Sequence, residues 1–219
     1  MPRAKIAVGE YYHIYNRGNN KQEIFADEKD YIRFLFLTLY LQGNNSIYNI
    51  SRYVSFFVRH RMFNINIKAE GILSDRYVEL VSFVFMPNHF HMIVKETKEG
   101  GISKYLQRIQ NAYTKYINTK NSKIGHLFQG AFQSVHINSN EQLLHLSAYV
   151  HRNPRELRKW KNKEHLFQWS SYDDFVKENR WGGLLKPEII LRQFSSSKEY
   201  QNFVNTSGTK LTLDEEHLI

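Results

Sequence analysis

Four side chains of this sequence have the types and spacing of a metal site with a nucleophile beside it. His89 and His91 flank Phe90. On a β-strand, residues two apart lie on the same face, so both imidazoles would converge on one cation while Phe90 enters the core. Tyr149 and Asn153 are four residues apart, a spacing that places a phenol and an amide side by side on a helix. The amide oxygen is a candidate third ligand, and the phenol is a candidate nucleophile.

The absence of cysteine narrows the chemistry of such a site. The 219 residues contain none, which excludes disulfides, thiolate catalysis and zinc sites of the cysteine type. Any metal must then be held by imidazole, amide or carboxylate groups. Imidazole suits a transition ion, whereas oxygen ligands and cellular availability favour magnesium, so we expect Mg²⁺ or Mn²⁺.

The elements that must position these side chains are two strands and a helix. Residues 77–85 form a mostly apolar run that predicts a buried strand, 86–88 predict a turn, and 89–95 predict the hairpin partner that carries both histidines. Asn138, Ser139 and Asn140 offer caps for a helix that Pro154 ends. Tyr149 and Asn153 would therefore lie near the C-terminal end of this helix.

Four further segments complete the expected fold. Residues 11–16 predict a first strand, which ends in the turn-forming residues 17–20, and a helix should begin at Asp27, where acidic residues gather, and continue to Gly43. Apolar residues three and four apart predict a helix over 102–120. Residues 125–137 resemble a loop that leads into a short strand.

Two regions are harder to place. Residues 44–75 mix apolar and basic positions without a clean period; we interpret them as an insertion with a helix near 51–61. The tryptophans and aromatics of residues 155–219 predict a helical C-terminal extension with a polar tail.

Other tyrosines compete with Tyr149 as the nucleophile, since the chain has 14 of them. The strongest competitors are Tyr113 and Tyr116, on the basic helix after the histidine strand. The residues four positions later are Ile117 and Lys120, neither of which ligates a metal. We therefore expect core packing or DNA contact for these two tyrosines and keep Tyr149 as the nucleophile.

The charge balance points to an anionic polymer. The formal net charge is +9, and aromatic residues, on which unpaired bases stack, make up 15% of the chain. A basic surface that serves only solubility is the alternative. No stretch approaches the roughly 20 apolar residues of a membrane span, and the first residues have no signal-peptide core, so we expect a cytoplasmic protein without a membrane partner.

Three groups of residues are candidates for phosphate or nucleic-acid contact. One directly follows the nucleophile helix, one follows the first strand, and one forms a stripe on helix 102–120. A solvated charged face is the alternative for each. The candidates are Arg152, Arg155, Arg158 and Lys159; Arg17, Asn19 and Asn20; and Lys104, Arg108 and Lys115.

Four motifs in order give the chain a family resemblance. It resembles the REP-associated tyrosine transposases, a branch of the HUH single-strand DNA transposases, where HUH means histidine, hydrophobic, histidine. The matching segments cover most of the chain, and only residues 44–75 look inserted. They are 13–20 (HIYNRGNN), 86–91 (MPNHFH), 149–154 (YVHRNP) and 169–172 (WSSY).

The resemblance implies a function. A divalent cation on His89, His91 and Asn153 would polarise a DNA phosphate, and Tyr149 would attack it to form a 5′-phosphotyrosine and a free 3′ hydroxyl. The substrate would be single-stranded DNA with a REP-like hairpin, which would associate the protein with the nucleoid. A hairpin-binding module without cleavage activity and a metal-dependent hydrolase that uses water remain alternatives, and so do monomer and homodimer.

The resemblance also implies an α+β fold of the split β-α-β, ferredoxin-like type. We expect a central antiparallel sheet with helices on one face. The predicted catalytic domain is 1–154, with 44–75 as its insertion, and residues 155–219 form the helical extension.

Overall fold

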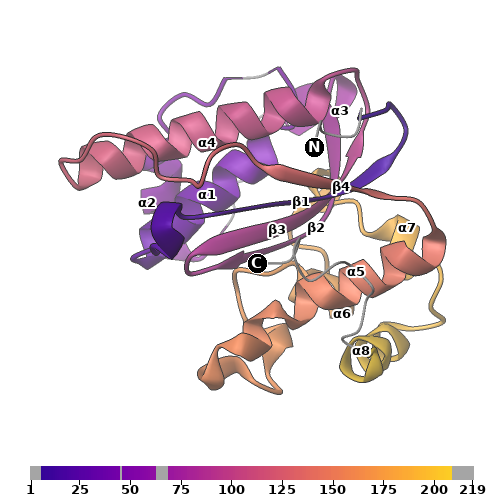
Figure 1. Ribbon diagram of the computed structural model, residues 1–219. Coiled ribbons are helices and arrows are strands. Elements are labelled where there is room, and N and C mark those ends of the chain that lie inside the picture. Colours follow the sequence, from indigo (N-terminus) through magenta and orange to yellow (C-terminus); the bar gives the residue numbers. More distant parts are fainter. Residues whose placement is uncertain (1–5, 45, 63–68, 209–219) are drawn as a thin grey trace.

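The computed structural model describes residues 6–44, 46–62 and 69–208 (Figure 1). The remaining parts of the predicted insertion and of the C-terminal extension lie outside the described residues. The strands are β1 (Tyr11–Arg17), β2 (Val78–Met86), β3 (His89–Glu96) and β4 (Gln133–Ile137). The α-helices are α1 (Glu28–Tyr40), α2 (Ile50–His60), α3 (Ala69–Ser74), α4 (Gly101–Lys120), α5 (Asn140–Arg152), α6 (Tyr172–Val176), α7 (Glu188–Leu191) and α8 (Ser197–Thr206). Short 3-10 helices occupy Asn19–Lys21, Asn153–Glu156, Arg158–Trp160, Glu164–Leu166 and Gly182–Leu184.

The four strands form one sheet in the order β2-β3-β1-β4. Every neighbouring pair is antiparallel. Strands β1 and β2 are consecutive in the chain, yet β3 lies between them, which is the split β-α-β arrangement. This topology confirms the predicted α+β class. It also makes β3, which carries the two histidines, a central strand with a partner on each side.

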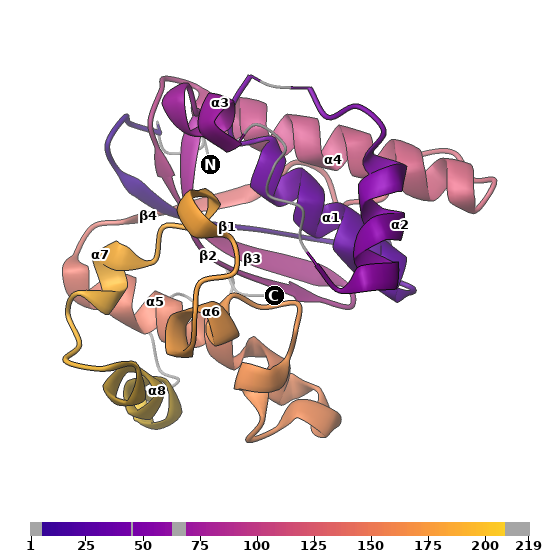
Figure 2. The same ribbon diagram turned by 180° about the vertical axis from the view of Figure 1, so that it is seen from behind.

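Helices cover both faces of the sheet, so the expectation of helices on one face is wrong. Helices α1 and α4 lie on one side and α5 to α8 on the other (Figures 1 and 2). The alternation of β3 shows why both layers are needed. Phe90 packs against Phe34 of α1, with ring centroids 5.2 Å apart, whereas His91 faces Tyr149 of α5 at 5.3 Å. Almost all of β2 is buried, as a strand between two helical layers must be.

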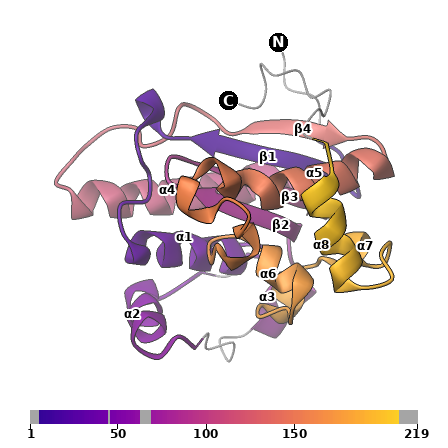
Figure 3. The same ribbon diagram turned by 90° about the horizontal axis from the view of Figure 1, so that it is seen from below.

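Helix α5 begins and ends at the residues that the sequence indicates. The Ser139 side chain caps it by accepting a hydrogen bond from the Gln142 amide at 3.1 Å. At the other end, α5 ends at Arg152, and a 3-10 turn begins at Asn153 with Pro154 as its second residue. The helix lies across the sheet and contacts β2, β3 and β4 (Figure 3). Its last turn is thereby held above the histidine strand.

The C-terminal region packs directly on the sheet. Its backbone is hydrogen-bonded to β2 at three places: Phe85 N to Trp169 O at 2.9 Å, Ser171 N to Phe83 O at 3.0 Å and Lys186 N to Leu80 O at 2.7 Å. The buried side chains of this region belong to the same hydrophobic core as those of the sheet. The boundary between a catalytic domain of residues 1–154 and an extension of residues 155–219 stays a prediction. No helix in the described ranges has the length and apolar character that crossing a membrane requires.

Candidate active site

A tight turn between β2 and β3 fixes the start of the histidine strand. The Pro87 carbonyl accepts hydrogen bonds from the backbone amides of Ile24 and Phe25, at 2.8 and 3.1 Å. The Asn88 carbonyl accepts one from Gly18 N at 2.8 Å. Because the turn is tied to the segment after β1, the first residue of β3 has little freedom to move.

His89 and His91 lie on the face of the sheet that α5 covers. Their ring centroids are 5.1 Å apart and the ring planes are nearly perpendicular. His89 Nδ1 lies 2.7 Å from Asn88 Oδ1, which leaves Nε2 directed away from the turn. The predicted shared face of the two imidazoles is confirmed.

A third histidine, His13 of β1, lies beside His91 and contacts its ring. His13 Nε2 lies 2.9 Å from His91 Nδ1, and both side chains are buried. The second ring nitrogen of His91, Nε2, is buried without a hydrogen-bond partner. If His91 donates its Nδ1 proton to His13, its Nε2 carries the lone pair that a metal ion needs.

Helix α5 brings Tyr149 and Asn153 to the two histidines. Asn153 Oδ1 lies 3.3 Å from His89 Nε2, and the Tyr149 ring stands edge-on to His91 with a centroid separation of 5.3 Å. The Asn153 amide group donates to the Tyr149 carbonyl at 3.0 Å, which directs its oxygen toward His89. The structure thus brings together the four residues that the sequence singles out.

Burial sets the protonation states of these groups. It lowers the pKa of His89 and holds the pKa of His91 well below its ordinary value, so both rings are neutral near pH 7. Burial also raises the pKa of Tyr149 to about 12, an effect that a hydrogen bond with Asn153 opposes. The imidazoles are therefore in the form that binds metals, whereas the phenol needs help to ionise.

The donor set fits a divalent metal. With the Asn88 side chain accepting from His89 Nδ1, the free lone pair of His89 Nε2 faces the Asn153 oxygen at 3.3 Å. Two lone pairs at this distance require a proton or a metal cation between them, and the unpartnered His91 Nε2 is a third donor on the same face. Within the described residues, no cluster of three His, Cys, Asp or Glu side chains suits a metal ion. A three-ligand site at this place would therefore have to include an amide oxygen such as that of Asn153.

The predicted DNA-contact residues fall into two groups. Arg17 lies opposite His89 in the β1–β3 pairing, and its charge lowers the pKa of that histidine. The turn with Asn19 and Asn20 follows directly. Lys115, Arg158 and Lys159 are exposed. Arg17 is also hydrogen-bonded within the protein, since its Nε donates to the Gln129 side chain.

The other four candidates are engaged within the protein. Lys104 Nζ lies 2.6 Å from the Tyr77 hydroxyl, and Arg108 donates to the Gly43 carbonyl. Arg152 donates to the Ser207 carbonyl, and Arg155 Nε lies 2.5 Å from Glu164 Oε1. These contacts stabilise the packing of the chain on itself. DNA contact by each of the ten residues stays a prediction.

The competing tyrosines of α4 take structural roles. The Tyr113 hydroxyl donates to the Ile24 carbonyl at 2.6 Å and is buried. The Tyr116 hydroxyl donates to Asp30 Oδ1 at 2.8 Å. Both lie on the face of the sheet away from the histidines, which agrees with the expected core packing or DNA contact, and their exclusion as nucleophiles stays a prediction.

Sequence reasoning missed His13 as a member of the site. On β1, His13 lies on the same face as Tyr15 and Arg17, because residues two apart on a strand share a face. This alternation could have identified His13 as a candidate. Its contact with His91 depends on the register that pairs Tyr15 with His91. Because that register pairs residues far apart in the chain, a local sequence pattern does not predict the contact.

Comparison with known proteins assigns the chain to a family and a fold. The family described as "Transposase IS200 like" matches residues 8–153. The structure of a REP-associated tyrosine transposase bound to a REP hairpin is similar, with a TM-score of 0.54 and 16% identity over 90% of this chain and 94% of that chain. A candidate transposase from Deinococcus radiodurans R1 covers 69% of this chain and 97% of its own at 13% identity, but its TM-score of 0.34 is too low to support an assignment. No curated protein sequence matches the chain.

Proposed function

This chain belongs to the IS200-like transposase family, and from that premise we propose that it is a metal-dependent single-strand DNA endonuclease and strand transferase. Tyr149 is the proposed nucleophile, and the intermediate is a 5′-phosphotyrosine. The observation that carries the proposal is the convergence at one point of Tyr149, the unpartnered His91 Nε2 and the Asn153 oxygen facing His89. An ordinary sheet–helix contact would bury apolar groups there.

The proposed metal ligands are His89 Nε2, His91 Nε2 and Asn153 Oδ1, with Mg²⁺ or Mn²⁺ as the ion. When bound, the ion supplies Lewis-acid polarisation of the scissile phosphate and neutralises developing negative charge. His13 holds the His91 ring in the metal-binding tautomer. Asn153 has two tasks, since its oxygen is a ligand while its amide group holds the helix end that carries Tyr149.

The covalent step exchanges one phosphate ester for another. The Tyr149 oxygen attacks phosphorus, the bond from phosphorus to the 3′ oxygen breaks, and that oxygen leaves as a 3′ hydroxyl with the proton that the phenol gives up. The new Tyr149–phosphate ester keeps the energy of the bond that was broken. A second 3′ hydroxyl can therefore reverse the step and join two strand ends without ATP.

We propose a hairpin-containing single strand of the REP type as substrate, by analogy with the REP hairpin bound to the structurally similar transposase. The narrower assignment to the REP-associated branch is part of this proposal. Arg17, beside His89, would hold a phosphate of the bound strand. Since one chain supplies Tyr149, both histidines and Asn153, a monomer would be catalytically complete.

The test is formation of a covalent protein–DNA adduct. The protein is incubated with Mn²⁺ and a pool of end-labelled single-stranded hairpins with random flanking sequence, and adducts are separated on a denaturing gel. We expect an adduct with the wild type and none with Tyr149→Phe. The matched control is Tyr15→Phe, because the Tyr15 ring lies 5.7 Å from His91 and is the other phenol close to that ring; this variant should keep the adduct.

Other outcomes would reject the proposal. Binding without any adduct would favour a hairpin-binding module, and cleavage that survives Tyr149→Phe would favour a hydrolase that uses water. Equal cleavage of duplex DNA would reject the single-strand specificity.

A further inference from the structure

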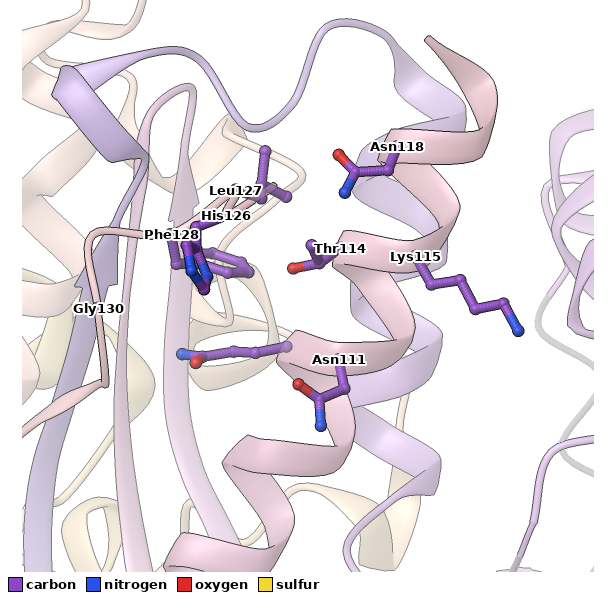
Figure 4. A pocket seen from close by; sticks show the side chains of 9 residues that line it. Asn111, Thr114, Lys115, Asn118, His126, Leu127, Phe128 and Gly130 are labelled. Carbon is purple, nitrogen blue, oxygen red and sulfur yellow. The ribbon is translucent and has the colours of Figure 1, made fainter. Parts of the chain in front are cut away.

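A polar pocket of about 400 Å³ lies on the other helical layer, between the second half of α4 and residues 126–130, which lead into β4 (Figure 4). Gln110, Asn111, Thr114 and Asn118 line it from α4, and His126 and Phe128 line it from the loop. The volume is at the small end of the roughly 300–1,000 Å³ that ligand sites occupy. It suits one small planar group.

The pocket has an unsatisfied hydrogen-bond donor. The side-chain nitrogen of Gln110 is buried without a hydrogen-bond partner. A buried donor in this state is unfavourable, and rotation of the Gln110 side chain toward an acceptor on a ligand in the pocket would satisfy it. The Asn118 amide group already donates to the Gly125 carbonyl at 2.9 Å, which supports the loop that closes the pocket.

The lining favours a neutral polar ligand over a phosphate. Amides, a hydroxyl and the His126 imidazole supply the polar groups, no carboxylate lines the pocket, and Lys115 is its single Lys or Arg. The pocket lies along the second half of α4, near the negative end of the helix dipole, which disfavours an anion. Paired donors and acceptors on amide side chains match the edges of nucleobases.

The pocket is connected to the active site by hydrogen bonds. The Asn19 amide donates to the Leu127 carbonyl at 2.8 Å, and the Gln129 amide donates to the Arg17 carbonyl at 2.9 Å. Arg17 Nε also donates to the Gln129 side chain. Because Arg17 pairs with His89, a strand held at the metal site can pass Arg17 and reach the loop.

We propose that this pocket binds one unpaired nucleobase of the DNA strand, with the Gln110 amide group donating to a base acceptor. The inference rests on the proposed function, because that function supplies the single strand. It adds a site of base recognition at a distance from the chemistry.

Binding assays test the pocket separately from catalysis. All variants are made in the Tyr149→Phe background and measured without metal, so that failure of the proposed chemistry does not affect the result. Fluorescence anisotropy gives the Kd for labelled dA, dT and dC 12-mers and for an abasic 12-mer. Gln110→Leu removes the donor and keeps most of the volume, and Gln201→Leu of α8 is the matched control.

We expect Gln110→Leu to weaken binding of at least one base-bearing oligonucleotide by about fivefold or more relative to the abasic strand, the loss of one base contact. Gln201→Leu should change none of the four Kd values. If Gln110→Leu does not fold, Asn111→Leu, at an exposed pocket position, is judged by the same criterion. Unchanged binding, or equal weakening of the abasic strand, would overturn the proposal.

Discussion

At the residue scale, the site is built from hydrogen bonds that give each ring one orientation. The spacing of His89 and His91 and that of Tyr149 and Asn153 are local, so period-two and period-four patterns predict their shared faces. The role of His13 is set by strand pairing, which no local pattern contains. The sequence likewise does not predict that the Gln110 side-chain nitrogen is buried without a partner, because a buried amide on a helix looks like any other polar residue in the sequence.

The hydrogen bond from His91 to His13 predicts an effect on metal affinity. His13→Leu removes the acceptor for the His91 Nδ1 proton and should weaken Mn²⁺ binding about tenfold. His13→Gln, whose side-chain oxygen can accept the same proton, should keep most of the affinity. Titration of free Mn²⁺ by electron paramagnetic resonance measures this. His136→Leu, on β4, is the control, and an unchanged affinity in His13→Leu would contradict the positioning role.

At the element scale, the segment after β1 fixes the catalytic turn and the pocket loop together. Residues 18–25 bind the carbonyls of Pro87 and Asn88 on one side, and Asn19 binds Leu127 on the other. The sequence predicts the strands and the turns but not these contacts between turns. Such contacts form only when distant segments fold together.

Gly18 is where this packing is tightest. A Cβ at this position would overlap the Gln22 carbonyl oxygen and lie 3.0 Å from the Ile24 side chain. Gly18→Ala should therefore lower the free energy of unfolding by about 1–3 kcal/mol, measured by urea denaturation. Gly208→Ala is the matched control, because nothing lies within 4 Å of its added Cβ. An equal stability of the two variants would mean that the turn can relax freely.

At the scale of the whole molecule, the second helical layer was the part that sequence reasoning misjudged. The strand and helix patterns predict the elements of the core, including α1 and α4, whereas its split β-α-β arrangement follows from the family resemblance. The other face is covered by α5 and the C-terminal region, which share a core with the sheet. Five of the predicted DNA-contact residues, Arg17 among them, make side-chain hydrogen bonds inside the protein, and charge patterns alone do not distinguish such residues from exposed ones.

This second layer predicts a loss of stability in acid. His151 of α5 is buried between Tyr200 and Ser171, and burial lowers its pKa from 6.5 to about 3. The unfolded chain takes up the proton near pH 6.5 and the folded chain does not, so stability that is present above pH 6.5 is lost as the pH falls toward 3. Between pH 7.5 and 5.5 this group should cost about 1.4 kcal/mol.

Urea denaturation at the two pH values checks the effect. His151→Asn cannot take up the proton, so the free energy of unfolding should depend less on pH than in the wild type, by about the same 1.4 kcal/mol. His136→Asn, at a partly exposed position, should keep the wild-type pH dependence. A His151→Asn variant with the wild-type dependence would show that His151 is already protonated in the folded protein.

The most direct test of the account is to locate the DNA on the protein. After reaction with Mn²⁺ and the hairpin pool, nuclease trimming and trypsin digestion, mass spectrometry should find a nucleotide joined through its 5′ phosphate to the peptide of residues 124–152. That peptide contains Tyr149 as its only tyrosine. Attachment to the peptide of residues 6–17, which carries Tyr15, or cleaved DNA with no attached peptide, would contradict the assignment of Tyr149 as the nucleophile.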